Sequence, residues 1–176
     1  MSKYTLIVPI AADTDKMGTE MPYLFGLDSN GLMYCVKSIM GLPLEAFSDI
    51  YFTILHKHNL RYKLLEMMQI QFERLGIAHK THVYELWEST SSQPETLYHT
   101  VVGNHITGAV LFKDGDSYFT TEVYPENMLY IFPLDGVQSV AKYTKSYVTI
   151  DEQYYITNII EKKFVSRFFC AGGYSI

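Results

Sequence analysis

The first two-thirds of the chain alternates short continuous hydrophobic runs with segments in which hydrophobic residues recur at helical spacing. A continuous run is typical of a strand buried on both faces, as in a parallel sheet. Such runs predict four strands, at residues 5–10, 49–55, 81–86 and 108–113.

Three helices are predicted between these runs, at residues 30–40, 59–76 and 92–103. Asn59 is the expected N-cap of the second helix, and Gly76 is its expected stop. The third helix has the clearest start, because Ser92 and Glu95 have the spacing of a capping box. Pro94 falls in its first turn, where the missing N–H costs nothing.

After Asp116 the pattern changes to strands joined by turns. They are expected at residues 118–123, 128–132, 147–150, 156–161 and 164–171. Strands that alternate with helices favour parallel pairing with helices on both faces of the sheet. We therefore expect one α/β domain over residues 1–176, a three-layer Rossmann-like mixed sheet with a β-rich C-terminal half.

Ligands of such sheets bind beyond the carboxyl ends of the strands, where the strand order reverses. The candidate functional residues are therefore those that directly follow the strands in the first two-thirds. They lie at residues 11–17, 56–59, 87–93 and 114–117.

Composition removes several classes of function. The net charge is −5 and no basic run stands out, so a nucleic-acid binder is not expected. No apolar stretch approaches the length of a membrane span, and the N-terminal apolar run is too short for a signal peptide. The two cysteines lie far apart without a C-x-x-C partner, which disfavours a metal or redox role. We expect a reduced, cytoplasmic protein.

Tyrosine is abundant, with 15 residues in a chain of 176. Its side chain buries area while keeping a polar tip. The excess is compatible with a ligand cleft or a subunit interface, and equally with a tyrosine-rich edge of the core.

Five short motifs occur in order along nearly the whole chain. They are L-I-V-P-I-A-A at residues 6–12, T-S-S-Q-P-E-T at 90–96, K-D-G-D-S-Y-F at 113–119, I-I-E-K-K at 159–163 and F-C-A-G-G-Y at 169–174. With them the chain resembles the sugar-phosphate nucleotidyltransferases of capsule and cell-surface polysaccharide synthesis, in particular their glucose-1-phosphate thymidylyltransferase-like branch. The resemblance implies the GT-A or nucleotidyltransferase-like version of the Rossmann-like fold.

In that family a sugar phosphate attacks the α-phosphorus of a nucleoside triphosphate, and pyrophosphate leaves. The resemblance implies that Asp116 holds Mg²⁺ between protein and phosphates, with Asp114 as a possible second ligand. Residues 114–117 by themselves also fit an ordinary hairpin turn, for which Asp-Gly is a strong signal.

The other motifs imply substrate contacts. Lys162 would hold the sugar phosphate as a catalytic residue, and Glu161 would accept hydrogen bonds from sugar hydroxyls. Gln93, at a helix N-terminus, would read the edge of a nucleobase. The alternatives are a solvated strand end for the first two and a simple helix cap around the third. The remaining implied substrate contacts are Ala11 and Ala12 in the phosphate loop and Gly173 in the glycine-rich strand.

The sequence departs from the family pattern on the triphosphate side. The glycine-rich loop A-G-x-G-x-R is replaced by A-A-D-T-D-K-M at residues 11–17, so both glycines are missing. A Cβ at those positions hinders close approach of the backbone to phosphate, and the new carboxylates repel it. The family's Pro-Lys pair becomes Pro22-Tyr23, without the lysine that stabilises the transferring phosphate. The family's C-terminal extension, with a second metal-binding aspartate, is also expected to be missing.

Three hypotheses follow. The first is a nucleotidyltransferase-like protein that binds a nucleotide or sugar phosphate with weak or no turnover, the sugar-phosphate end being better preserved. The second is an active enzyme in which Asp13 or Asp15 supplies a metal ligand. The third is a structural subunit, a homodimer or partner of another chain, that pairs through a sheet edge at residues 164–176.

Overall fold

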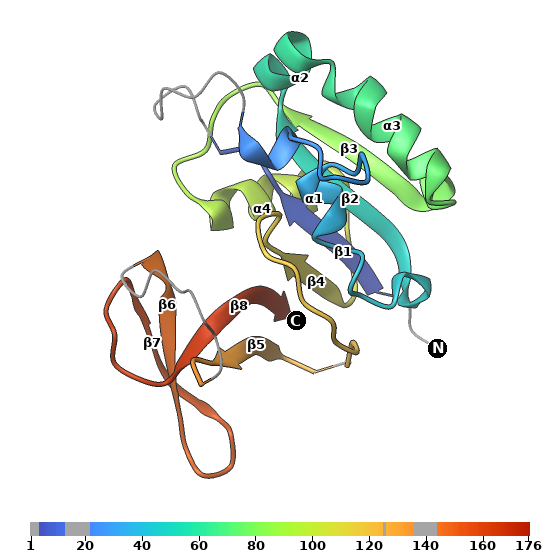
Figure 1. Ribbon diagram of the computed structural model, residues 1–176. Helices are drawn as coiled ribbons and strands as arrows, with labels where there is room; N and C mark the ends of the chain where they lie inside the picture. The colour runs from blue at the N-terminus through green and yellow to red at the C-terminus, as the bar shows by residue number, and fades with distance from the viewer. Residues whose placement is uncertain (1–3, 13–21, 125, 136–143) are drawn as a thin grey trace.

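The computed structural model describes residues 4–12, 22–124, 126–135 and 144–176. Within these ranges eight strands form one sheet with the order β3-β2-β1-β4-β8-β6-β7, and β5 pairs with β8 (Figure 1). The strands are β1 (Tyr4–Pro9), β2 (Phe47–Leu55), β3 (Thr81–Leu86), β4 (Val110–Lys113), β5 (Met128–Pro133), β6 (Ser146–Ile150), β7 (Ile156–Glu161) and β8 (Phe168–Ser175).

The sheet changes character at β4. Strands β1 to β4 pair in parallel, with β1 between β2 and β4. β8 then runs antiparallel to β4, and the pairs β5–β8, β6–β8 and β6–β7 are antiparallel as well. The expectation of a mixed sheet with a β-rich C-terminal half is confirmed.

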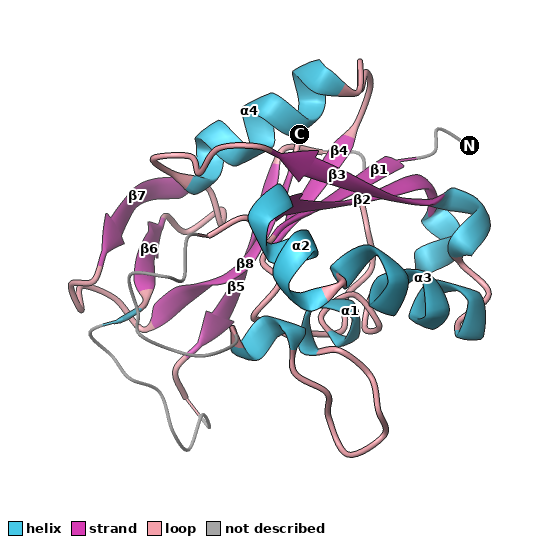
Figure 2. Ribbon diagram, turned by 90° about the horizontal axis from the view of Figure 1, so that it is seen from above, coloured by secondary structure: helices cyan, strands magenta, loops and turns pink. Residues whose placement is uncertain are grey.

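Helices cover both faces of the parallel part. α4 (Gln93–Gly103) lies on one face, and α1 (Tyr34–Lys37), α2 (His56–Tyr62) and α3 (Leu64–Arg74) lie on the other (Figure 2). Because side chains alternate along a strand, β1 sends Leu6 and Val8 into the main hydrophobic core beneath α1 and α3. On the opposite face the hydroxyl groups of Thr53 and Thr100 are hydrogen-bonded at 2.6 Å, which ties β2 to α4.

Two predicted helices differ from the structure. The helix expected at residues 30–40 is reduced to Tyr34–Lys37, because Gly31 has a φ of 74° and the preceding turn ends only at Met33. The helix expected at residues 59–76 is two helices, α2 and α3, divided at Lys63, whose φ is 54°. Asn59 is not the N-cap that the sequence predicted, because it lies inside α2. Its Oδ1 instead accepts the backbone N–H of Leu65 at 3.0 Å, in the first turn of α3.

The C-terminal half differs in two places. Residues 118–123 form no strand; they run along the core, where Phe119 packs against Tyr130 and the carbonyl of Gly41 accepts the N–H of Thr121. The strand expected at residues 164–171 is shifted to Phe168–Ser175. β8 pairs with β5 on one side and with β4 and β6 on the other, so the expectation of an open sheet edge at residues 164–176 is wrong. Among the described strands, β3, β5 and β7 each pair with one neighbour only. In the described residues, no helix is long and apolar enough to cross a membrane.

The turn before α1 is organised by one carboxylate. Asp28 accepts the N–H groups of Asn30 at 2.8 Å and Leu32 at 3.0 Å, and the ammonium of Lys37 at 2.8 Å. These bonds, above all the one from Lys37, lower the pKa of Asp28 from 3.8 to about 2.

We predict that Asp28→Asn lowers the free energy of unfolding at neutral pH, because the ion pair with Lys37 is lost. The folded-state pKa is depressed, so the stabilisation is present above the ordinary pKa of 3.8 and is lost as pH falls toward 2. Urea unfolding at several pH values should therefore show the difference between wild type and variant vanishing near pH 2. Glu88→Gln, at an exposed carboxylate, is the control; a difference for Asp28→Asn that stays constant with pH would contradict the prediction.

Candidate functional site

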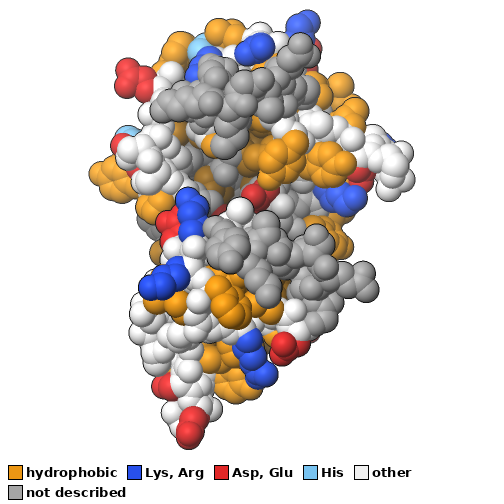
Figure 3. Space-filling view, turned by 60° about the vertical axis from the view of Figure 1, so that its left-hand side comes forward, with side chains coloured by type: hydrophobic (Ala, Val, Ile, Leu, Met, Phe, Trp, Pro, Cys, Tyr) orange, Lys and Arg blue, Asp and Glu red, His pale blue; other side chains and the backbone are white. Residues whose placement is uncertain are grey.

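A cavity of about 490 Å³ opens at the carboxyl ends of β1 and β4. From β1 the chain passes outward to β2 and β3 and then crosses back to β4 on the other side, so the strand order reverses here. The lining residues come from the ends of β1 and β4, from the start of α4 and from the short 3₁₀ helix Tyr23–Phe25. They are Pro9, Ile10, Ala11, Ala12, Leu24, Thr90, Ser91, Ser92, Gln93, Thr96, Asp114, Gly115 and Asp116. Figure 3 shows the molecule hollowed between its helical and β-rich parts, with acidic side chains at the hollow and basic ones beside it.

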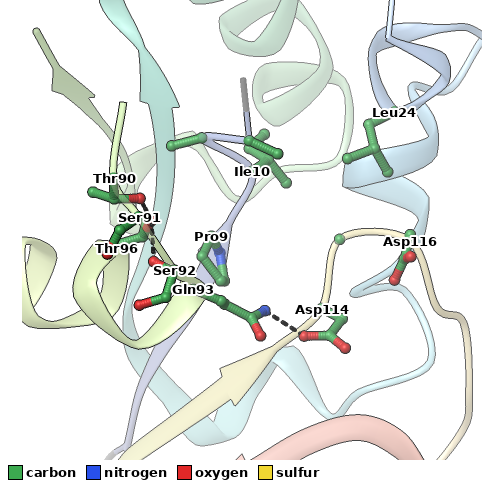
Figure 4. Close-up of a pocket in the computed structure, with 13 residues that line it drawn as sticks. Pro9, Ile10, Leu24, Thr90, Ser91, Ser92, Gln93, Thr96, Asp114 and Asp116 are labelled. Atoms are coloured by element: carbon green, nitrogen blue, oxygen red, sulfur yellow. Dashed lines mark hydrogen bonds between the residues drawn. The ribbon is translucent and has the colours of Figure 1, made fainter. Parts of the chain in front are cut away.

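The start of α4 is fixed by a cap in which the side chain of Gln93 takes no part. Ser92 Oγ accepts the N–H of Glu95 at 3.4 Å, while the Glu95 carboxylate accepts both the N–H and the hydroxyl of Ser91 at 2.6 and 2.7 Å. The predicted cap at Ser92 and Glu95 is confirmed. Gln93 takes no part in it and points across the cavity toward the end of β4 (Figure 4).

Gln93 and Asp114 join the two sides of the cavity. Gln93 Nε2 donates to Asp114 Oδ1 at 2.5 Å. Burial raises the pKa of the Asp114 carboxyl, and the hydrogen bond from Gln93 opposes that rise. The backbone N–H of Asp114 donates to the carbonyl of Gly172 at 2.7 Å. Asp114 is therefore held in place by neighbouring groups on both sides.

Asp116 is the more exposed of the two carboxylates. It lies beside Tyr23, and the pKa of Tyr23 rises to about 12, first through burial and then through the negative charge of Asp116. A second cavity of about 240 Å³ borders Asp116 on the other side of the turn, between Tyr23 and Tyr118. Asp116 thus lies between two cavities, where a ligand in the larger one can reach it.

The hairpin alternative for residues 114–117 is wrong. β4 pairs with β1 and β8, and the residues after the turn form no strand that could return along it. The acidic turn instead projects from the end of a central strand. Asp114 and Asp116 therefore lie at the sheet's carboxyl edge, where ligands of such sheets bind.

Lys113 is a site residue that the sequence reasoning did not single out. Its side chain is completely buried, and its Nζ donates to the carbonyl of Asp114 at 2.9 Å and to both the carbonyl and the hydroxyl of Ser117. Burial lowers the pKa of Lys113 to about 8, although Asp114 and Asp116 act in the opposite direction. A lysine as the last residue of a buried strand was the available sequence signal.

The sugar-side residues lie apart from the cavity lining. Glu161 and Lys162, at the end of β7, form an ion pair with each other at 2.9 Å, and both side chains are about two-thirds exposed. The backbone N–H of Lys162 donates to the carbonyl of Lys145 at 2.9 Å. The charge of Lys145 works against the rise in the pKa of the Asp114 carboxyl that burial causes. The end of the β6–β7 hairpin therefore contributes positive charge to the surroundings of the acidic turn.

Of the predicted backbone contacts, Ala11 and Ala12 line the cavity, whereas Gly173 does not. Gly173 pairs with Lys113 in the sheet, and a Cβ there would lie 2.8 Å from the ring of Phe119 and 2.9 Å from the ring of Tyr130. Its place in β8 is thus explained by packing. Asp13, Asp15 and Lys16 lie outside the described residues.

The acidic turn fits one kind of metal site. In the described residues no group of three or more His, Cys, Asp or Glu side chains could hold a metal ion by itself. Mg²⁺, however, is commonly bound through one or two carboxylates together with substrate phosphates and water. Asp116, with Asp114 beside it, suits that arrangement, and the family resemblance implies the same ion.

Comparison with known proteins identifies the fold. No family model and no curated protein sequence matches the chain. Similar solved structures include the inositol-1-phosphate CTP transferase of T. maritima (TM-score 0.73, 12% identity, 99% of this chain and 70% of that one); a nucleoside-diphosphate-sugar pyrophosphorylase of Vibrio cholerae RC9 (0.74, 18%, 97% and 72%); and a putative glucose-1-phosphate thymidylyltransferase of Bacillus anthracis (0.70, 14%, 99% and 71%). The chain has a nucleotidyltransferase-like fold.

Gly172 provides a test of how closely Asp114 is packed. Its φ is 79°, and a Cβ would collide with the carboxylate of Asp114. Gly76 has a similar φ of 71° with no atom within 4 Å of the added Cβ. We predict that Gly76→Ala costs about 1 kcal/mol through backbone strain and that Gly172→Ala costs at least ~1 kcal/mol more through the collision.

Urea unfolding of the two variants measures the difference directly, because the backbone contribution is nearly the same in both. Equal losses of unfolding free energy would mean that Asp114 moves aside without cost and is not held as the structure indicates.

Proposed function

We propose that this protein binds a nucleoside phosphate, together with a divalent cation, in the cavity at the ends of β1 and β4, and transfers nucleotide slowly or not at all. The observation that carries the proposal is the convergence of Gln93, Asp114 and Asp116 on this cavity at the reversal of strand order. The names of the similar structures, a CTP transferase, a nucleoside-diphosphate-sugar pyrophosphorylase and a thymidylyltransferase, support a nucleotide as the ligand.

The residues would divide the work as follows. Bound Mg²⁺ would neutralise phosphate charge, with Asp116 as its main protein ligand. Asp114 would be a weaker ligand, because one of its oxygens already accepts from Gln93. Gln93 would orient Asp114 as well as contact a base. The N-terminus of the eleven-residue helix α4 faces the same cavity and favours negative charge there.

Slow turnover is proposed from the sequence of the phosphate loop. Residues 11–17 lack both glycines, and Pro22-Tyr23 stands where the family has Pro-Lys. Tyr23 lies beside Asp116, and its raised pKa leaves it without a charge that could offset that of a transferring phosphate. Loss of such preorganised electrostatic stabilisation typically lowers the rate 10²–10³-fold for one donor. An active enzyme that uses Asp13 or Asp15 as a metal ligand is the alternative.

A sugar phosphate is the second candidate ligand. Its support is the charge of Lys145, which acts on the Asp114 carboxyl, together with the backbone hydrogen bond that holds Lys162 next to Lys145. A phosphate between these lysines and a metal ion on Asp116 would be neutralised from both sides. From the family resemblance we propose a role for such a ligand in capsule or cell-surface polysaccharide synthesis. A structural role, as one subunit of a homodimer or of a larger assembly, is the remaining alternative.

The test is thermal unfolding with CTP, UTP, dTTP, GTP and hexose 1-phosphates, each with and without Mg²⁺. A ligand at ~100 times its Kd stabilises the folded state by about 2.7 kcal/mol. For a chain of this size that corresponds to a rise in Tm of roughly 5–10 °C. We expect at least one nucleotide to give such a rise only with Mg²⁺, and Asp116→Asn to abolish it, while the control Glu88→Gln keeps it.

If no nucleotide or sugar phosphate changes the Tm, ligand binding is refuted and the structural-subunit hypothesis remains. Release of pyrophosphate from the stabilising nucleotide and its sugar phosphate then separates a binding protein from an enzyme. Release at several turnovers per second would contradict slow turnover, since typical enzymes reach 1–10³ s⁻¹.

A further inference from the structure

We propose that Lys113 is a positioning residue of this site: its buried ammonium group holds the turn of residues 114–117 in the shape that presents the Asp116 carboxylate to the cavity. The inference rests on the proposed function, in which Asp116 is the protein's main ligand to the divalent cation.

The hydrogen bonds of Lys113 enclose the part of the turn that carries Asp116. Nζ donates to the carbonyl of Asp114 at 2.9 Å, to the hydroxyl of Ser117 at 2.7 Å and to the carbonyl of Ser117. The acceptors therefore lie on the residues before and after Gly115-Asp116. One cation bonded to both ends of the turn fixes the position of the two residues between them.

The surroundings leave this turn little room to change. On its β1 side, a Cβ on Gly115 would collide with the side chain of Ile10, so the backbone there packs directly against the core. On the other side, the Lys113 ammonium lies 4.5 Å from the centre of the Phe119 ring, a cation–π contact. The turn is thus packed between β1 and a buried cation before any ligand binds.

The choice of lysine is informative, because burying an ammonium group is costly and an apolar side chain would fill the space without that cost. Lysine has three donor hydrogens and no acceptor, and this site offers three oxygen acceptors, two of them backbone carbonyls that point inward. Its positive charge also lies close enough to Asp114 and Asp116 to interact with both. The lysine is therefore matched to an acidic turn whose carbonyls face the core.

The inference is tested by measuring how tightly the full chain binds Mn²⁺. The readout is the decrease in the electron paramagnetic resonance signal of free Mn²⁺ as the ion binds. Removing a positive charge near two carboxylates would by itself strengthen cation binding. A positioning role predicts the opposite: in Lys113→Met the turn relaxes and the Kd for Mn²⁺ rises about tenfold. Ser117→Ala, which keeps the charge and removes one acceptor, should raise the Kd several-fold.

Phe72→Leu is the control, because it disturbs the core where Phe72 stacks on Phe52 and leaves the turn and all three hydrogen bonds of Lys113 in place. It should lower the Tm with little change in Kd. Equal Kd values for wild type and Lys113→Met would overturn the inference while leaving the proposed function intact. Should Lys113→Met fail to fold, an unchanged Kd in Ser117→Ala would overturn it in the same way. Wild-type protein that binds no Mn²⁺ would overturn both the metal role of Asp116 and this inference.

Discussion

The pairing of β4 with two different neighbours is the constraint on which the rest of the structure depends. On one side β4 runs parallel to β1, and on the other β8 runs antiparallel to it. Both edges of β4 are already paired, so the residues that follow it cannot fold back beside it as a hairpin. The chain must leave the sheet at Lys113, and it does so through the acidic turn that enters the cleft.

The same pairing brings the β-rich half to the site. Gly173 of β8 lies opposite Lys113, and Gly172 accepts the N–H of Asp114. Lys145, whose charge acts on the Asp114 carboxyl, directly precedes β6, and β6 pairs with the first residues of β8. Residues separated by about thirty positions in the chain therefore share one electrostatic environment because β8 pairs with both β4 and β6.

Positive and negative groups lie next to each other at this site. Two carboxylates follow a buried strand, and a buried ammonium group lies beneath them with its donors turned to two backbone carbonyls and the Ser117 hydroxyl rather than to the carboxylates. Asp114 accepts a hydrogen bond from Gln93, whereas Asp116 is more exposed and lies beside Tyr23. The negative potential of the two carboxylates therefore remains available to a ligand in the cavity, while the buried ammonium group partly offsets it. It favours a cationic ligand, or an anion that brings a cation with it.

The sequence by itself determined the alternation of strands and helices, because a continuous apolar run and a helical stripe bury different surfaces. It also located the cap at Ser92 and the acidic turn after β4. Tertiary structure alone decided that Lys63 breaks a regular apolar stripe, that residues 118–123 lie unpaired along the core, and that β8 is central rather than an edge. It likewise decided that Lys113 is buried beneath the turn while Glu161 and Lys162 stay exposed. The reason is that local patterns record which face of an element is apolar, whereas strand order and the partners of a buried charge depend on segments far apart in the chain.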